Sequence, residues 1–144
     1  KRKALMIYLD TSILVSYYCP EVVSDSVEKI ILKAKQPAIS LLTEVEFVSA
    51  ISKKIREKNL SRTDGEKIFG EFQLHSKQQL FQWIPIHPEH YEIAKSWIGK
   101  FTCPLRTLDA LHLAVVSLNN FILLTADIQL ARSAGFLGIK KKLI

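Results

Sequence analysis

The sequence predicts an α/β fold, with a central, mostly parallel sheet of four to five strands that is covered by helices on both faces. Two features predict this fold. Short, nearly continuous apolar runs are typical of strands buried on both faces. Longer amphipathic stretches alternate with them, as in right-handed βαβ crossovers. The chain of 144 residues is long enough for one core, so we expect 1–144 to be a single domain. The predicted strands are residues 4–9, 38–42, 81–86 and 121–125.

The first half of the chain is predicted to contain one short helix and three longer ones. The short helix begins near Ser12, directly after the first strand. Residues 24–35 and 43–58 place apolar side chains three and four residues apart, as amphipathic helices do. The more polar stretch 61–79 is expected to begin at a Ser61 N-cap. Consecutive helices between the second and third strands make this a helix-rich variant of the fold.

Three further helices are predicted in the second half. Residues 88–98 begin with Pro88, which suits a first helical turn. Thr107–Leu118 has its apolar residues in helical register, and 127–134 forms a short last helix for which Gly135 suits the C-terminal cap. Ligand sites in open parallel sheets lie beyond the carboxyl ends of the strands. Polar residues that directly follow strands are therefore the candidate functional residues.

Charge and cysteine content narrow the functional classes. The 20 Lys and Arg exceed the 14 Asp and Glu, which gives a net charge of +6. This charge suits a polyanionic partner such as nucleic acid, or an acidic protein. Cys19 and Cys103 form neither a disulfide framework nor a zinc site, so we expect a reducing, cytoplasmic location. No apolar run approaches the ~20 residues of a membrane span, and we expect no membrane association.

Four carboxylates follow predicted strands or open the next helix: Asp10, Glu46, Asp109 and Asp127. Two unit charges ~5 Å apart repel by roughly 3 kcal/mol at an effective dielectric of ~20. If the four side chains converge, they must therefore protonate or bind a cation. All-oxygen ligands select hard ions such as Mg²⁺ or Mn²⁺. Such a site on a basic protein indicates phosphate chemistry.

Each carboxylate also has a purely structural interpretation. Asp10 and Asp127 suit helix N-caps, and Asp109 complements a helix dipole in a first turn. Thr43 and Glu46 have the spacing of a capping box, with Thr43 at the N-cap. Spacing alone therefore does not establish that the four groups meet.

Four segments occur in the order and spacing of PIN domains, and the chain resembles most the VapC-type toxins of toxin–antitoxin pairs. They read MIYLDTS at 6–12, SLLTEVEF at 40–47, RTLDALHLA at 106–114 and LTAD at 124–127. The resemblance covers essentially the whole chain. It implies a three-layer α/β/α PIN-like fold.

The resemblance also implies a metal-dependent endoribonuclease acting on single-stranded RNA, often a homodimer. A small VapB-like antitoxin typically inserts a segment near the active site. Matched position by position, Asp10, Glu46, Asp109 and Asp127 are the family acids. The resemblance favours Glu46 over Glu44, which periodicity leaves open because a helical wheel puts Glu44 near the apolar stripe. The hydroxyl residues that support the cluster correspond to Thr11, Ser12 and Thr125.

These matches lead to a mechanistic hypothesis. We expect Asp10 and Asp109 to hold the principal Mg²⁺, while Asp127 and Glu46 complete a second metal shell or position the attacking water. In-line attack on the phosphodiester would leave a 5′-phosphate and a 3′-hydroxyl. Arg106 is a candidate phosphate contact because its guanidinium binds phosphate in a bidentate way.

Other interpretations stay open. A PIN-domain RNA-processing nuclease without an antitoxin would carry the same acids. A non-catalytic binding module or a phospho-acceptor signalling domain belongs to a different class, but the latter lacks an acid beside Asp10 and a late strand-end lysine. His112, one turn after Asp109, is expected to pack or hydrogen-bond. The basic runs at 1–3 and 140–142 are expected to be solvated tails.

Overall fold

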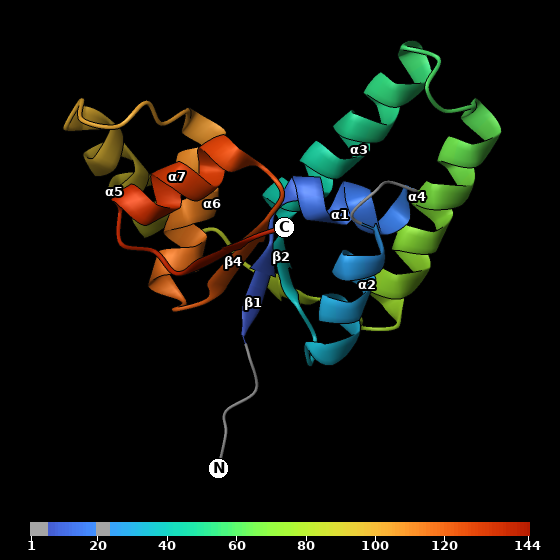
Figure 1. Ribbon diagram of the computed structural model, residues 1–144, viewed down its shortest axis with the longest axis horizontal. Helices are drawn as coiled ribbons and strands as arrows, with labels where there is room; N and C mark the ends of the chain where they lie inside the picture. Colours follow the sequence, from blue (N-terminus) through green and yellow to red (C-terminus); the bar gives the residue numbers. More distant parts are fainter. Residues whose placement is uncertain (1–5, 20–23) are drawn as a thin grey trace.

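A five-stranded parallel sheet forms the centre of the molecule in the computed structural model, which describes residues 6–19 and 24–144 (Figure 1). The strand order is β3-β2-β1-β4-β5, and every neighbouring pair is parallel. The strands are β1 (Ile7–Leu9), β2 (Ala38–Ser40), β3 (Gln82–Ile84), β4 (Ile122–Thr125) and β5 (Lys141–Leu143). The helices are α1 (Thr11–Tyr18), α2 (Ser24–Lys33), α3 (Leu41–Arg56), α4 (Arg62–Lys77), α5 (Pro88–Gly99), α6 (Thr107–Leu118) and α7 (Ile128–Phe136).

Helices cover both faces of the sheet, so the predicted α/β/α three-layer architecture is confirmed. Helices α1 to α4 pack on one face, and α5 to α7 pack on the other (Figure 1). The alternation of side chains along β1 separates the two cores: Ile7 and Leu9 enter the first, and Tyr8 enters the second. Helix α6 is buried along residues 110–116, because it lies between the sheet and α5.

Strand β5 corrects the expectation that the basic run 140–142 is a solvated tail. Lys141 and Lys142 pair in register with Leu123 and Leu124 of β4. The strand lies at the edge of the sheet, and its side chains are exposed. Lysine on an edge strand discourages pairing with another chain. The apolar-run criterion misses such a strand because it detects only buried ones. The run 1–3 and residues 4–5 of the predicted first strand lie outside the described residues.

Two helix ends differ from the prediction in a way that changes the capping residues: the start of α3 and the end of α7. Helix α3 begins at Leu41 and its N-cap is Ser40, whose Oγ accepts from the Thr43 N–H at 3.4 Å, while Thr43 Oγ1 accepts from the Ser40 N–H at 3.2 Å. The predicted capping box from Thr43 to Glu46 is therefore wrong. Helix α7 continues through Gly135, and Gly138 instead takes the left-handed conformation after it, with φ 73°.

Several predicted helix signals are confirmed. Ser61 caps α4, because its Oγ accepts from the Asp64 N–H at 3.0 Å. Pro88 is the first residue of α5, and the bounds of α6 agree with the predicted ones. Within residues 6–19 and 24–144, no helix combines the length and the apolar content that crossing a bilayer requires.

Candidate active site

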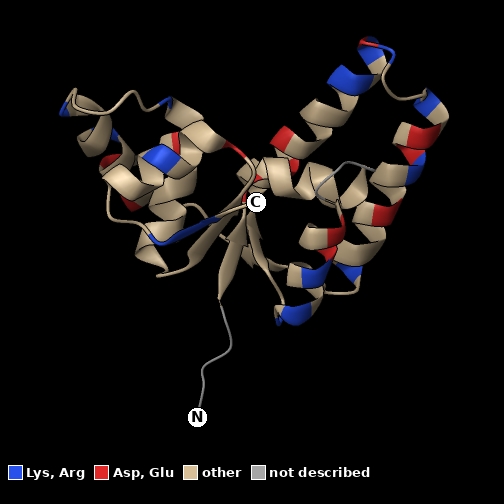
Figure 2. Cartoon of the chain, viewed as in Figure 1, with Lys and Arg blue, Asp and Glu red and all other residues tan. Residues whose placement is uncertain are grey.

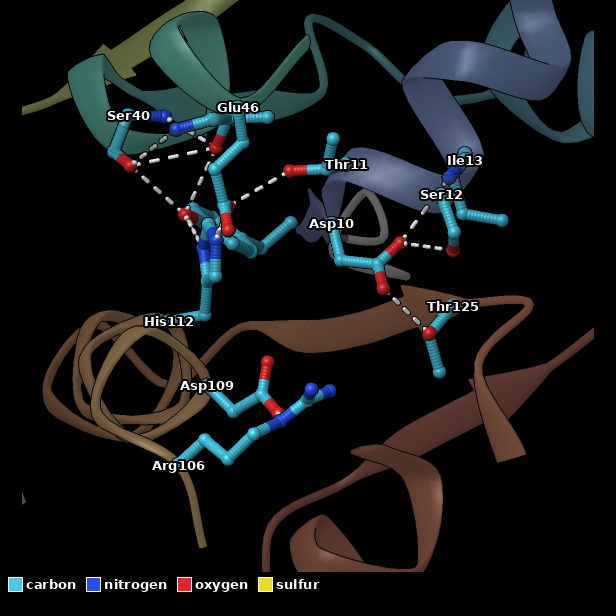
Figure 3. A network of polar contacts seen from close by, with 12 residues as sticks. Asp10, Thr11, Ser12, Ile13, Ser40, Glu46, Arg106, Asp109, His112 and Thr125 are labelled. Carbon is cyan, nitrogen blue, oxygen red and sulfur yellow. Dashed lines mark hydrogen bonds and ion pairs between the residues drawn. The ribbon is translucent and has the colours of Figure 1, made fainter. Parts of the chain in front are cut away.

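A cavity of about 180 Å³ lies at the carboxyl ends of β1 and β4, where the two helical layers meet. All four carboxylates predicted from the sequence line it, together with four hydroxyl, guanidinium or imidazole groups of the same motifs. Figure 3 shows Asp10, Glu46 and Asp109 among them. In Figure 2, acidic positions lie between the two helical layers just above the strands. We call this space the carboxylate cavity; its lining residues are Asp10, Thr11, Ser12, Glu46, Arg106, Asp109, His112, Asp127 and Leu130.

Asp10 is both the N-cap of α1 and a wall of the carboxylate cavity. Its Oδ1 accepts from the Ile13 N–H at 3.1 Å and from Ser12 Oγ at 2.6 Å, and its Oδ2 accepts from Thr125 Oγ1 at 2.6 Å. Burial raises the pKa of this carboxyl, and the three hydrogen bonds only partly oppose that rise. Asp10 thus caps α1 and lines the cavity at the same time, so the structural interpretation does not exclude the functional one.

Two hydroxyl groups tie the turn after β1 to the turn after β4. Thr125 Oγ1 donates to Asp10 and accepts from the Asp127 N–H at 2.9 Å. Ser12 Oγ donates to Asp10 and accepts from the Ala126 N–H at 3.0 Å. These hydrogen bonds fix the two turns relative to each other, and with them two of the carboxylates.

Glu46 reaches the carboxylate cavity from α3, whereas Glu44 does not line it. Its Oε1 accepts from Thr11 Oγ1 at 2.9 Å and is hydrogen-bonded to His112 Nε2 (Figure 3). Burial raises the pKa of Glu46, but the hydrogen bond and charge of His112 and the Thr11 hydroxyl outweigh it, so the pKa lies below its ordinary value. Periodicity left this choice open, and the apolar stripe beside Glu44, formed by Val48, Ile51 and Ile55, lines a groove between α3 and α4 and not the carboxylate cavity.

A buried tyrosine extends this network, and the sequence did not reveal it. Tyr8 OH lies 2.7 Å from His112 Nδ1, 2.9 Å from Ser40 Oγ and 3.1 Å from Thr43 Oγ1. Burial raises the pKa of Tyr8 and keeps the hydroxyl neutral. His112 is itself buried, as expected for a packed or hydrogen-bonded histidine. The only sequence signal was a tyrosine inside a buried strand, which needs a hydrogen-bond partner but does not name it.

Asp109 and Asp127 form the opposite wall. Asp127 caps α7, and its Oδ1 accepts from the Gln129 N–H at 2.9 Å and the Leu130 N–H at 3.2 Å. Arg106 Nε lies 3.5 Å from Asp109 Oδ2, at the exposed rim. Burial raises the pKa of Asp109; the Arg106 charge opposes this, and the charges of Asp127 and Glu46 add to it. A cation bound at this wall would relieve the repulsion among these carboxylates.

The donor set fits a hard divalent cation held partly through water. In the part of the chain that the structure describes, no three Asp, Glu, His or Cys side chains stand close enough together to hold an ion directly. Each carboxylate is already engaged, although a carboxylate offers about four acceptor positions and Asp10 uses three. Mg²⁺ keeps several waters and binds through one or two carboxylates plus phosphate oxygens. The cavity supplies carboxylate oxygens for such an ion, and water and substrate phosphate would complete its coordination.

Comparison with known structures gives the same fold. The VapBC2 complex of Rickettsia felis bound to a promoter DNA fragment matches with TM-score 0.67 and 17% identity, over 96% of this chain and 98% of that chain. FitAcB from Neisseria gonorrhoeae matches with TM-score 0.70 and 16% identity, over 94% and 96%. VapC20 of Mycobacterium tuberculosis, described as a sarcin-ricin loop cleaving toxin, matches with TM-score 0.68 and 12% identity, over 88% and 94%.

The sequence itself identifies the family. No curated protein matches it significantly. The PIN domain profile, however, matches residues 7–135, a span that runs from β1 into α7 and contains all four carboxylates. The chain therefore belongs to the PIN domain family.

Proposed function

We propose that this chain is a Mg²⁺- or Mn²⁺-dependent endoribonuclease that cleaves single-stranded RNA, and that it is the toxin of a toxin–antitoxin pair. The observation that carries the proposal is the shared cavity, because Asp10, Glu46, Asp109 and Asp127 come from four separate segments and line one space. PIN-domain nucleases generally depend on divalent metals. The net charge of +6 suits a polyanionic substrate.

Asp10 and Asp109 are assigned to the principal ion, directly or through water. Burial disfavours the charge on both carboxylates, as their raised pKa values show, and a cation relieves that cost. Asp127 and Glu46 are assigned to a second, weaker site or to positioning of the attacking water. When bound, the ion supplies neutralisation of phosphate charge and activation of water.

The chain's own groups then orient the reactants. Glu46, kept ionised by His112 and Thr11, accepts a hydrogen bond from the attacking water. Arg106 stands at the rim with its side chain 78% exposed, so it can exchange its ion pair with Asp109 for a substrate phosphate. The new bond forms between the water oxygen and phosphorus, and the bond to the 3′ oxygen breaks. The water gives up a proton and the departing 3′ oxygen takes one up, both exchanged with solvent. The products are a 5′-phosphate and a 3′-hydroxyl.

A VapB-like antitoxin and a homodimer belong to the same proposal, as do a cytoplasmic location and a single domain over 1–144. The structural neighbours that are VapBC and FitAB complexes support the antitoxin. A content of only two cysteines, Cys19 and Cys103, suits a reducing compartment. An RNA-processing nuclease without an antitoxin is the alternative. Co-expression with a small acidic protein encoded next to it distinguishes the two, because only a toxin is held inactive by such a neighbour.

Cleavage mapping tests the proposed reaction. Purified wild type is incubated with total RNA in Mg²⁺ or in EDTA, beside the Asp10→Asn variant and a Glu44→Gln control outside the cavity. We expect cuts with 5′-phosphate ends in Mg²⁺ for wild type and Glu44→Gln, and none in EDTA or for Asp10→Asn. Undiminished cleavage by a folded Asp10→Asn protein would contradict the assignment.

A further inference from the structure

A second open cavity, of about 380 Å³, lies between the loop before α6 and one face of α7. Its α7 residues are spaced three, four and seven positions apart, so they share one helix face. We call it the α7 cavity. Its lining residues are Thr102, Cys103, Pro104, Gln129, Arg132, Ser133 and Phe136.

The α7 cavity adjoins the carboxylate cavity along two separate stretches of chain. On α7, Leu130 lines the carboxylate cavity and Gln129 and Arg132 line the α7 cavity. On the loop, Arg106 lines the first and Pro104 the second. Two residues span at most about 7 Å of extended chain and about 3 Å along a helix. The two cavities are therefore close enough for a strand whose phosphate occupies the carboxylate cavity to place a neighbouring nucleotide in the α7 cavity.

The chemistry of the α7 cavity differs from that of its neighbour. None of its described lining residues is acidic. Arg132 is exposed and forms no ion pair with another described residue. Phe136 is 63% exposed, and the Gln129 amide, also exposed, offers both a donor and an acceptor. A single exposed phenylalanine is ordinary, but an aromatic ring, a free guanidinium and an amide in one hollow are the groups that bind an unstacked nucleotide.

We propose that the α7 cavity binds the nucleotide next to the scissile phosphate of a single-stranded RNA. Phe136 stacks on its base, Arg132 contacts its phosphate, and Gln129 hydrogen-bonds to a base edge. The proposal rests on the proposed nuclease function of the carboxylate cavity. It explains a preference for single strands, because a base within a duplex is stacked on its neighbours and does not reach Phe136.

Kinetics on a short single-stranded RNA test the assignment. Stacking on one aromatic side chain contributes enough that its loss weakens binding about tenfold. We expect Phe136→Ala and Arg132→Ala to raise KM by about that factor with kcat nearly unchanged, since they remove binding common to substrate and transition state. Phe136→Trp should restore KM. The matched controls are Tyr91→Ala, on an α5 aromatic that is 57% exposed, and Arg62→Ala on α4, and both should leave KM unchanged.

Cys103 provides a direct probe, because its thiol lines the α7 cavity, 3.7 Å from Ser133 Oγ. Cys19 is only 5% exposed and serves as the slow internal reference. In the Asp10→Asn protein, saturating single-stranded RNA should slow alkylation of Cys103 by iodoacetamide severalfold, whereas duplex DNA of the same length should not. An alkylation rate that RNA does not change would overturn the proposal.

The outcomes separate this proposal from the one on which it rests. If wild type does not cleave RNA in Mg²⁺, the nuclease assignment fails. If wild type cleaves RNA and Phe136→Ala cleaves with an unchanged KM, only the nucleotide subsite fails. If the variants leave the KM for RNA unchanged but weaken binding of an acidic protein partner, the α7 cavity is a protein-binding site and the proposal is wrong.

Discussion

Thr125 Oγ1 donates a 2.6 Å hydrogen bond to Asp10 Oδ2, although the two residues are 115 positions apart in the sequence. The same oxygen accepts from the Asp127 N–H, so one hydroxyl contacts a carboxylate of the first turn and the backbone of the second. The parallel pairing of β1 with β4 makes this possible, because it brings the carboxyl ends of both strands to the same edge. The shape of the carboxylate cavity thus depends on the register of β1 and β4 and on the hydrogen bonds of Thr125 between the turns that follow these two strands.

Removing this hydroxyl should shift the acid limb of the cleavage profile. In Thr125→Val, the ionised Asp10 loses one donor, and hydrogen bonds to charged groups contribute about 1.5–3 kcal/mol. We therefore expect the pKa of Asp10 to rise further and kcat/KM to fall about tenfold or more at the acidic end of the range. Rates measured between about pH 5 and 8 check this shift. Thr125→Ser should behave like wild type. If the pH–rate profile of Thr125→Val coincided with that of wild type, the hydroxyl would not be needed.

Tyr8→Phe should destabilise the fold. The change removes one hydrogen bond from each of Ser40 Oγ, Thr43 Oγ1 and His112 Nδ1, and it leaves Nδ1 of the buried His112 without the partner that Tyr8 supplies. We expect a loss of about 1–3 kcal/mol in the free energy of unfolding, measured with urea. The control Tyr91→Phe, at an exposed position, should stay within about 0.5 kcal/mol of wild type. Equal unfolding curves for the two variants would contradict the network.

His112→Gln should raise the pKa of Glu46. Burial of Glu46 favours its neutral form, and the His112 hydrogen bond and charge are the principal forces that oppose this. Carboxyl carbon NMR during a pH titration measures the effect, with the Glu46 signal identified by its loss in Glu46→Gln. A Glu46 pKa that does not move in His112→Gln would show that the imidazole does not control this carboxylate.

Asp10→Asn should be at least as stable as wild type at neutral pH in the absence of metal. The folded-state pKa of Asp10 is raised, so its contribution to stability is fully present below its unfolded pKa and is lost as pH rises through the folded pKa. Asparagine cannot ionise, so the Asp10→Asn protein does not lose stability in this way as the pH rises. The difference in Tm, variant minus wild type, should therefore be small near pH 4 and should grow towards pH 8. A Tm difference that shrinks with rising pH would show that the pKa of Asp10 is lowered in the folded state, and would contradict this prediction.

Burial explains which parts of the fold the sequence could predict. The strands β1 to β4 and the buried α6 leave continuous or periodic apolar patterns, and all were found. The edge strand β5 consists of Lys141, Lys142 and Leu143, and it is recognisable only by its pairing with β4. The start of α3 was misplaced because Ser40 and Thr43 both suit an N-cap, and only the backbone geometry distinguishes them.

For the candidate site too, some features could be predicted from the sequence and others could not. The position of Asp10 and Asp127 at one cavity could be predicted, because polar residues after parallel strands lie at one edge of the sheet. Glu46 was selected over Glu44 by resemblance, since the side of α3 that faces the cavity depends on how that helix packs against α1 and α4. The partnership of Tyr8 with His112 joins residues 104 positions apart, and no local pattern encodes it.

Titration with Mn²⁺ followed by electron paramagnetic resonance tests the central claim most directly, that these carboxylates gather a hard divalent ion. Wild type should show saturable binding that Mg²⁺ displaces. Asp10→Asn and Asp109→Asn should weaken the binding at least about tenfold, while Glu44→Gln, outside the cavity, should leave it unchanged. Absence of a saturable site in wild type, or equal affinity in all four proteins, would contradict the claim.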